Sequence, residues 1–188
     1  MVSTNKNKVA SISRSLARYK INVKHINLSL PELQSDDFNE VATEKAKAAF
    51  ERTGKPCIVH DSGFFVTALN GFPGVLTHPV LDMVGIEGIL KLTEGKPREC
   101  GFVHCIAYYD GSIAAPKLFR SENMGTMSRA PKGSSNKHHW SRLFEIYIPN
   151  GESKTLAQMT AKEYWKWRDA NSVDESTTDF AKWYLKRK

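Results

Sequence analysis

The spacing of apolar residues predicts helices that alternate with strands in the first half of the chain. Residues 8–19 place apolar side chains every three or four positions, which is typical of a helix with one apolar face: Val9, Ile12, Leu16 and Tyr19. Residues 21–28 alternate apolar and polar side chains with a period of two, so we expect a half-buried strand there. Only Met1 and Val2 precede the first helix and its capping residues, so any strand before it must be very short.

A second helix is predicted over residues 37–52, because its first turn is acidic and Gly54 and Pro56 end it. Two apolar, strand-like runs follow, with Asp61-Ser62-Gly63 between them. A third helix is expected over residues 79–92.

Strands cluster in the second half of the chain. Residues 101–109 and 114–120 flank Asp110-Gly111, a pair typical of hairpin turns. A loop rich in glycine, serine and lysine precedes an expected strand at residues 143–148, and the tail, residues 160–186, is helical in pattern. Its aromatic residues are interpreted as core or dimer contacts. The whole pattern predicts an α/β or α+β fold built on a mixed sheet.

Composition changes this picture little. A chain of 188 residues with 40% hydrophobic and 25% charged residues suits one folded domain over residues 1–188. No apolar run approaches ~18 residues and the N-terminus lacks a signal-peptide core, so we expect a cytoplasmic protein. The three cysteines form no CxxC pair and are interpreted as reduced thiols. The net charge of +7 favours a phosphate-bearing partner, either a nucleic acid or a polyanionic small molecule.

Two groups of residues suggest a binding site for phosphate or for a metal ion. The basic turn from Ser3 to Lys8 stands at the N-terminus of a helix, where a phosphate would be favoured, although a capped surface loop explains it equally well. Glu32 and Asp61 each lie in a polar break beside an apolar segment. Their carboxylates are ligands that Mg²⁺ prefers, which makes convergence on one cation a hypothesis.

Residues 30–111 contain a longer set of motifs in a definite order. LPELQ is followed by an A-x-x-K-A helix at residues 42–46, by DSGFFVTALNGFPGV from Asp61, and by GIEGILKLTEG at residues 85–95. In order and spacing they resemble the inosine triphosphatase or Ham1 family of non-canonical purine nucleoside triphosphate pyrophosphatases. STNKNK at residues 3–8 is similar to the phosphate loop of that family.

The resemblance implies an α/β fold: an elongated mixed β-sheet with flanking helices, in two lobes around a central nucleotide-binding cleft. It also implies a homodimer that uses Mg²⁺ to hydrolyse a nucleoside triphosphate to the monophosphate and pyrophosphate. By this resemblance Asp61 would be the general base, with Glu32 and Asp61 as metal ligands. The residues expected to bind the triphosphate are Ser3, Thr4, Asn5, Lys8, Lys45 and Ser62.

The C-terminal third departs from the family pattern. Trp140 and Phe144 are retained, but Ser141 stands where the family has an aspartate. The family's purine-reading lysine and Ser-His-Arg triplet are replaced by Tyr164 and by Arg168-Asp169-Ala170. We therefore expect altered base specificity, with Trp140 stacking on the base and with Tyr164, Arg168 and Asp169 supplying hydrogen bonds. His60 also replaces an acid often found before the catalytic aspartate.

Two other interpretations stay open. The loss of the aspartate at Ser141 would suit a nucleotide-binding homologue with impaired catalysis. The basic charge would suit a nucleic-acid-binding protein, but the chain has no aromatic RNA-binding motif, so this interpretation ranks last.

Overall fold

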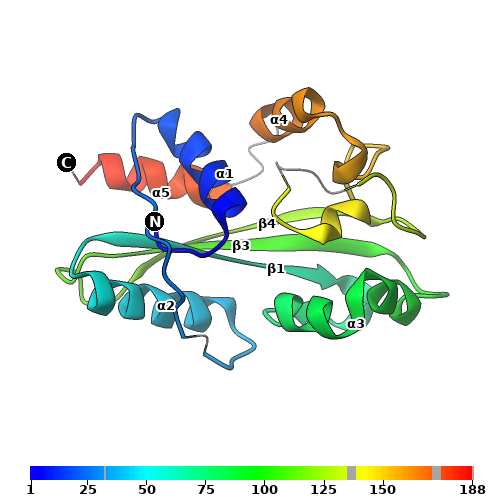
Figure 1. Ribbon diagram of the computed structural model, residues 1–188, viewed down its shortest axis with the longest axis horizontal. Coiled ribbons are helices and arrows are strands. Elements are labelled where there is room, and N and C mark those ends of the chain that lie inside the picture. The colour runs from blue at the N-terminus through cyan, green and yellow to red at the C-terminus, as the bar shows by residue number, and fades with distance from the viewer. Residues whose placement is uncertain (32, 135–138, 171–174, 188) are drawn as a thin grey trace. The chain divides into compact units, whose positions relative to one another are not determined.

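The computed structural model describes residues 1–31, 33–134, 139–170 and 175–187 and contains a five-stranded sheet (Figure 1). The strands lie in the order β2-β1-β3-β4-β5. Their bounds are β1 Cys57–Val66, β2 Pro73–Gly74, β3 Glu99–Tyr109, β4 Lys117–Met127 and β5 Tyr147–Pro149. The β1–β2 and β4–β5 pairs are antiparallel, with Phe64 opposite Gly74 and Met127 opposite Tyr147.

Helices follow and separate these strands. The α-helices are α1 Lys6–Ala17, α2 Phe38–Thr53, α3 Thr77–Leu92, α4 Ala161–Ala170 and α5 Glu175–Leu185. Short 3₁₀ helices are η1 Thr67–Leu69, η2 Arg142–Glu145 and η3 Leu156–Gln158. None of the described helices has the length and apolar character needed to span a bilayer. This α/β architecture confirms the predicted fold class.

The contacts divide the chain into two compact units. Unit 1 comprises Met1–Ser62, His104–Ser121 and Asp174–Lys188, and unit 2 comprises Gly63–Val103 and Glu122–Val173. Both units contain segments that are distant in sequence. The prediction of a single domain over residues 1–188 stays a prediction.

Unit 1 has three layers. On one face of its strands, Ile58, Ile106 and Phe119 pack against α1 and α5. On the other face, Val59 and Cys105 pack against the small side chains of α2. Figure 1 shows α1 and α5 on one side of these strands and α2 on the other. Successive residues of a strand point to opposite faces, so the buried run from Cys57 to His60 contributes side chains to the packing on both faces of β1.

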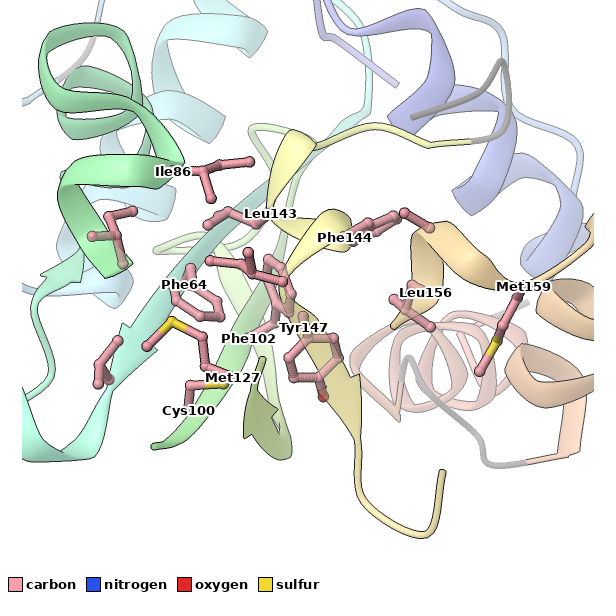
Figure 2. Packing of buried hydrophobic residues seen from close by; sticks show 14 of the residues in the cluster. Phe64, Ile86, Cys100, Phe102, Met127, Leu143, Phe144, Tyr147, Leu156 and Met159 are labelled. Carbon is pink, nitrogen blue, oxygen red and sulfur yellow. The ribbon is translucent and has the colours of Figure 1, made fainter. Parts of the chain in front are cut away.

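Unit 2 has one aromatic-rich core, shown in Figure 2. Phe102 lies at its centre and makes edge contacts with Phe64, Phe144 and Tyr147, at ring-centroid distances of 5.2, 5.8 and 4.9 Å. Ile86 and Ile89 of α3, both 0% exposed, complete it from another element. Edge-to-face rings of this kind add to the free energy gained by burying their apolar surface.

The predicted second helix is confirmed, and its ends are set by capping. The Asp37 side chain accepts a hydrogen bond from the Asn39 N–H at 2.8 Å, and Gly54 ends α2 in the left-handed conformation. The short N-terminal strand is also confirmed in a minimal form, because Val2 makes a single parallel bridge with Ile26. All three cysteines are buried free thiols, as expected.

Four strand predictions are wrong in whole or part. Residues 21–28 form one isolated bridge, because the Met1-Val2 segment is too short to build a ladder with them. Asp61-Ser62-Gly63 does not separate two strands but lies inside the continuous strand β1. Residues 143–148 begin with η2, and the strand β5 starts only at Tyr147. Strand β4 begins at Lys117 and continues to Met127, well past the predicted end at residue 120.

Candidate active site

Asp61 and Lys45 form an ion pair in unit 1. The Lys45 Nζ lies 3.1 Å from the Asp61 Oδ1, and the two side chains are 15% and 16% exposed. The pair is therefore largely shielded from water but still reachable from it. The sequence resemblance placed both residues in one site, and the structure brings them into direct contact.

The small residues of α2 explain why Lys45 reaches the strand. Ala42, Ala46 and Ala49 form a fully buried stripe, each 0% exposed, which allows α2 to pack closely on β1. Lys45 stands beside this stripe, three residues after Ala42, on the same side of the helix. Asp61 follows Cys57 and Val59 on the face of β1 that meets α2. The close packing of α2 on β1 thus brings the ammonium group within reach of the carboxylate.

A second group of predicted residues forms the turn that begins α1. The Asn5 N–H donates to the Ser3 Oγ at 3.1 Å, and the Lys8 N–H donates to the Asn5 Oδ1 at 3.0 Å. Asn5 is therefore the N-cap of α1, and the helix starts at Lys6 rather than at residue 8 as predicted. Thr4 is exposed in the same turn. The positive end of the helix dipole and the cations Lys6 and Lys8 make this turn attractive to an anion.

His60 and Ser62 flank Asp61 and occupy the opposite face of β1 by strand alternation. His60 is buried and stacks on His104 of β3, with ring centroids 5.4 Å apart and an interplanar angle of 12°. The hydroxyl of Ser62 is buried and accepts or donates no hydrogen bond within the described part of the chain. A buried hydroxyl in this state is unusual, and a phosphate oxygen would satisfy it. The predicted contact of Ser62 with a phosphate stays a prediction.

His104 was missed by sequence reasoning, although a signal existed. It lies two residues before Ile106 on β3, just as His60 lies two residues after Ile58 on β1. Both histidines therefore continue the face that carries Ile58 and Ile106. Period-two spacing on adjacent strands would have placed them together.

Asp61 suits a magnesium ion that is shared with a substrate. No group of three or more His, Cys, Asp or Glu side chains gathers in the described residues, so they build no all-protein cage. Mg²⁺ typically uses one or two carboxylates together with waters and substrate phosphates, and Asp61 supplies one such partly exposed carboxylate. The second predicted ligand, Glu32, lies outside the described residues.

The residues predicted to read the base lie in unit 2. Trp140 is half-buried and contacts Phe102 and Phe144 edge-on, at ring-centroid distances of 5.5 and 5.1 Å. Tyr164 is only 1% exposed and packs against His139 and Trp167. In this structure the Tyr164 ring belongs to the aromatic core, and its contact with a base stays a prediction.

Ser141 is the N-cap of the short helix η2. Its Oγ accepts a hydrogen bond from the Leu143 N–H at 3.2 Å and caps η2. A hydroxyl can perform this capping as well as a carboxylate can, but it brings no negative charge. Ser141 therefore stabilises the local turn without placing an ionised group at this position of unit 2.

Arg168 and Asp169 stand in the last turn of α4. Arg168 is 8% exposed, whereas Asp169 is exposed. The start of the same helix is fixed by a reciprocal cap, because the Thr160 N–H donates to Glu163 Oε2 at 2.8 Å and the Glu163 N–H donates to Thr160 Oγ1 at 3.2 Å. The backbone bond from Thr160 and the ion pair with Lys154 lower the pKa of Glu163 to about 2. Helix α4 thus presents Asp169 from a firmly anchored element.

Comparison with known proteins decides the family. The model of the Ham1 family matches residues 1–168. The chain belongs to the Ham1 family. The match covers both the Lys45–Asp61 pair and the turn at Ser3, and it ends before helix α5.

Two relatives illustrate the similarity in sequence. A protein of Methanopyrus kandleri named dITP/XTP pyrophosphatase is 39% identical over 170 residues, which cover 90% of this chain and 86% of the relative. A protein of Thermococcus kodakarensis with the same name is 36% identical over 163 residues, covering 86% and 85% of the two chains. A solved Ham1 structure from Coxiella burnetii superimposes with a TM-score of 0.79 over 98% of this chain and 96% of the other, at 23% identity, which supports the fold.

Proposed function

We propose that this Ham1 protein is a Mg²⁺-dependent nucleoside triphosphate pyrophosphatase that converts a ribo- or deoxyribonucleoside triphosphate to the monophosphate and pyrophosphate. The observation that carries the proposal is the ion pair of Lys45 and Asp61 at 3.1 Å, in a chain 39% identical to a protein named dITP/XTP pyrophosphatase. A carboxylate beside an ammonium group is what water activation next to a polyanionic substrate requires.

The residues have separate tasks in the proposed reaction. Asp61 takes a proton from a water molecule while the water oxygen attacks the α-phosphorus. A bond forms between that oxygen and the phosphorus, and the bond from the α-phosphorus to the bridging oxygen breaks, so that pyrophosphate leaves with the electron pair. Lys45 lies close enough to Asp61 to offset negative charge as it develops on the phosphoryl oxygens. Asp61 and the predicted ligand Glu32 would hold Mg²⁺, which would supply further charge neutralisation when bound.

The turn at the start of α1 supports binding of the triphosphate. Ser3, Asn5 and Lys8 are already joined by hydrogen bonds, so little conformational entropy is lost when an anion binds. Lys8 adds a positive charge in the first turn of α1. We assign Ser3, Thr4, Asn5 and Lys8 to the outer phosphates.

We also propose that base specificity differs from that of inosine and xanthosine triphosphatases. Two observations support this: Ser141 caps η2 without a charge, and Tyr164 is packed into the core. Trp140 is half-buried and could stack on a base, an interaction that tolerates many base types. The exposed carboxylate of Asp169 would accept a hydrogen bond from an exocyclic amino group.

The decisive experiment is a panel of nucleoside triphosphates assayed with Mg²⁺ for pyrophosphate release. The panel includes deoxy, oxidised and deaminated bases, and dITP and XTP serve as references. We expect pyrophosphate and the monophosphate as products, with a preferred base other than hypoxanthine or xanthine. Binding of nucleotides without any release would favour the impaired homologue, and tight, salt-dependent binding of single-stranded DNA without hydrolysis would favour a nucleic-acid-binding protein.

A homodimer is part of the proposal. Helix α3 and the residue before it leave four large apolar side chains exposed, namely Leu76 at 50%, Met83 at 75%, Val84 at 48% and Leu92 at 48%. Exposed apolar side chains that gather on one element are typical of protein interfaces. Light scattering after size-exclusion chromatography should give twice the 21.2 kDa mass of the chain, and a monomeric mass would contradict this part of the proposal.

A further inference from the structure

A histidine outside the predicted site contacts the turn that begins α1. The Nε2 of His25 lies 2.8 Å from the carbonyl oxygen of Ser3. His25 is exposed, and the resemblance gives it no role. The carbonyl accepts the bond, so Nε2 carries the hydrogen, as it does in one neutral tautomer and in the cation.

The position of His25 follows from the parallel bridge beside it. The Ser3 N–H donates to the Ile26 carbonyl at 3.1 Å, and the Ile26 N–H donates to the Met1 carbonyl at 2.9 Å. These two backbone bonds hold residues 1–3 against the segment that contains His25. The imidazole therefore adds a second bond between Ser3 and that segment.

Ser3 is connected to the start of α1 by a series of hydrogen bonds. Its Oγ accepts a hydrogen bond from the Asn5 N–H, and the Asn5 Oδ1 accepts one from the Lys8 N–H. The Val9 N–H then bonds to the Asn5 carbonyl at 3.1 Å, which starts the regular helix. A rotation of the Ser3 peptide would move the Oγ and so disturb each bond that follows it.

From this chain of bonds we propose that His25 is a positioning residue for the anion-binding turn Ser3–Lys8. It fixes the Ser3 carbonyl, which keeps the hydrogen-bonded turn and the positive end of the α1 dipole in place for a triphosphate. The proposal rests on the function proposed above for this turn. His25 itself touches no reacting atom and is not a catalytic residue.

The test compares His25→Phe, which keeps a ring but removes the donor, with His25→Gln, whose amide places an N–H at similar reach. Loss of one hydrogen bond of this type predicts a roughly threefold to tenfold effect. In His25→Phe we expect the Lys8 amide to exchange with deuterium faster by that factor, and inorganic tripolyphosphate to bind more weakly by the same factor in calorimetry. The KM for a nucleoside triphosphate should rise equally while kcat stays within about twofold. His25→Gln should restore all three values.

His78→Phe is the matched control, because His78 is an exposed histidine on α3 in unit 2. It should leave tripolyphosphate affinity unchanged. Unchanged exchange of the Lys8 amide in His25→Phe would overturn the anchoring role. Faster exchange with unchanged tripolyphosphate affinity would overturn the role in anion binding, as would a wild-type protein that binds no tripolyphosphate. A wild-type protein that binds tripolyphosphate but hydrolyses nothing would refute only the proposed pyrophosphatase activity.

Discussion

The carboxylate of Asp61 is positioned by two elements at once. Strand β1 fixes its backbone in the middle of the sheet, and helix α2 brings Lys45 to within 3.1 Å of its side chain. A catalytic group held by regular elements is oriented more accurately than one on a loop. Asp61 therefore has the fixed orientation that its proposed role, directing a water molecule at one phosphorus atom, requires.

Replacing Asp61 by Asn should remove the proposed general base without unfolding the protein. We expect kcat for pyrophosphate release to fall at least about 100-fold, because general base catalysis typically contributes that much. The amide can still accept a hydrogen bond from Lys45, so the thermal midpoint should change little. Asp82→Asn, an exposed carboxylate paired with His78 on α3, is the control. Near-normal turnover in Asp61→Asn would remove Asp61 from the mechanism.

Replacing Lys8 by Ala should weaken binding of the triphosphate about 10- to 100-fold, which corresponds to the loss of one hydrogen bond between charged groups. Binding of the monophosphate should weaken far less, because Lys8 is assigned to the outer phosphates. Calorimetry with both ligands measures the difference, and Lys24→Ala, an exposed lysine outside the turn, is the control. Equal losses for the two ligands would contradict the assignment.

The positions of these side chains were only partly predictable. The pairing of Lys45 with Asp61 came from the family motifs, since the two are 16 residues apart and no periodicity links them. Burial of Tyr164 was not predicted, because a tyrosine on a helix gives no sign of which neighbours will cover it. The contact of His25 with Ser3 depends on the Val2–Ile26 bridge, which pairs two segments far apart in sequence.

Among the helices and strands, prediction succeeded where the signal was local. Asp37 and Gly54 mark the ends of α2 through their own hydrogen-bonding and conformational preferences. It failed where structure depends on a partner. Residues 21–28 alternate like a strand but form a single bridge, between Ile26 and Val2. Polar Asp61 and Ser62 remain in β1 because the strand continues beyond them to Phe64 and Phe65, which pair with β2.

Gly133 illustrates a constraint between two loops of unit 2. It has a φ of +76°, and a Cβ there would collide with the backbone of Ala157 and Gln158 in η3. Thr155 strengthens the same contact, since its hydroxyl donates to the Lys132 carbonyl at 2.9 Å. The loop before residue 135 is therefore fixed against η3 by close backbone approach.

Replacing Gly133 by Ala should lower the free energy of unfolding by about 2–4 kcal/mol, through positive-φ strain together with overpacking. Gly95 is a matched control, with a φ of +70° and no neighbouring atom within 4 Å of the place that a Cβ would occupy. Gly95→Ala should cost only about 1 kcal/mol, the strain alone. Urea denaturation of both variants measures the difference, and equal losses would show that the contact with η3 contributes nothing.

For the molecule as a whole, helix α5 is notable because it follows the part matched by the Ham1 family, residues 1–168. Phe180 and Ala181 bury it in the core of unit 1. Beyond its end, Arg187 lies 3.2 Å from Asp110 and 4.8 Å from the centre of the Trp183 ring. Tyr108 donates to the same carboxylate at 2.9 Å. The C-terminal segment is thus tied to the turn between β3 and β4.

This tie should weaken in acid. Burial raises the pKa of Asp110, but hydrogen bonds from Ser112 and Tyr108, with the charge of Arg187, outweigh it and lower the pKa to about 2. Because the folded pKa lies below the ordinary value of 3.8, the contribution is complete above about pH 4 and is lost as the pH falls through about 2. Asp110→Asn should therefore reduce the free energy of unfolding by about 1 kcal/mol at pH 7 and by less at pH 3.

Urea titrations between about pH 7 and pH 2.5 check this expectation. Asp179→Asn, an exposed carboxylate on α5, is the control and should differ little from the wild type at any pH. A destabilisation by Asp110→Asn that is the same at every pH would contradict the proposed titration.

The chain passes from one unit to the other at four places, between residues 62 and 63, 103 and 104, 121 and 122, and 173 and 174. Neither unit is therefore encoded by one uninterrupted stretch of the gene. Recombination at a single junction therefore cannot exchange unit 1, which carries Asp61, while unit 2 is kept. Changes confined to one unit are reached more directly by point substitutions within an intact chain than by exchange of a segment.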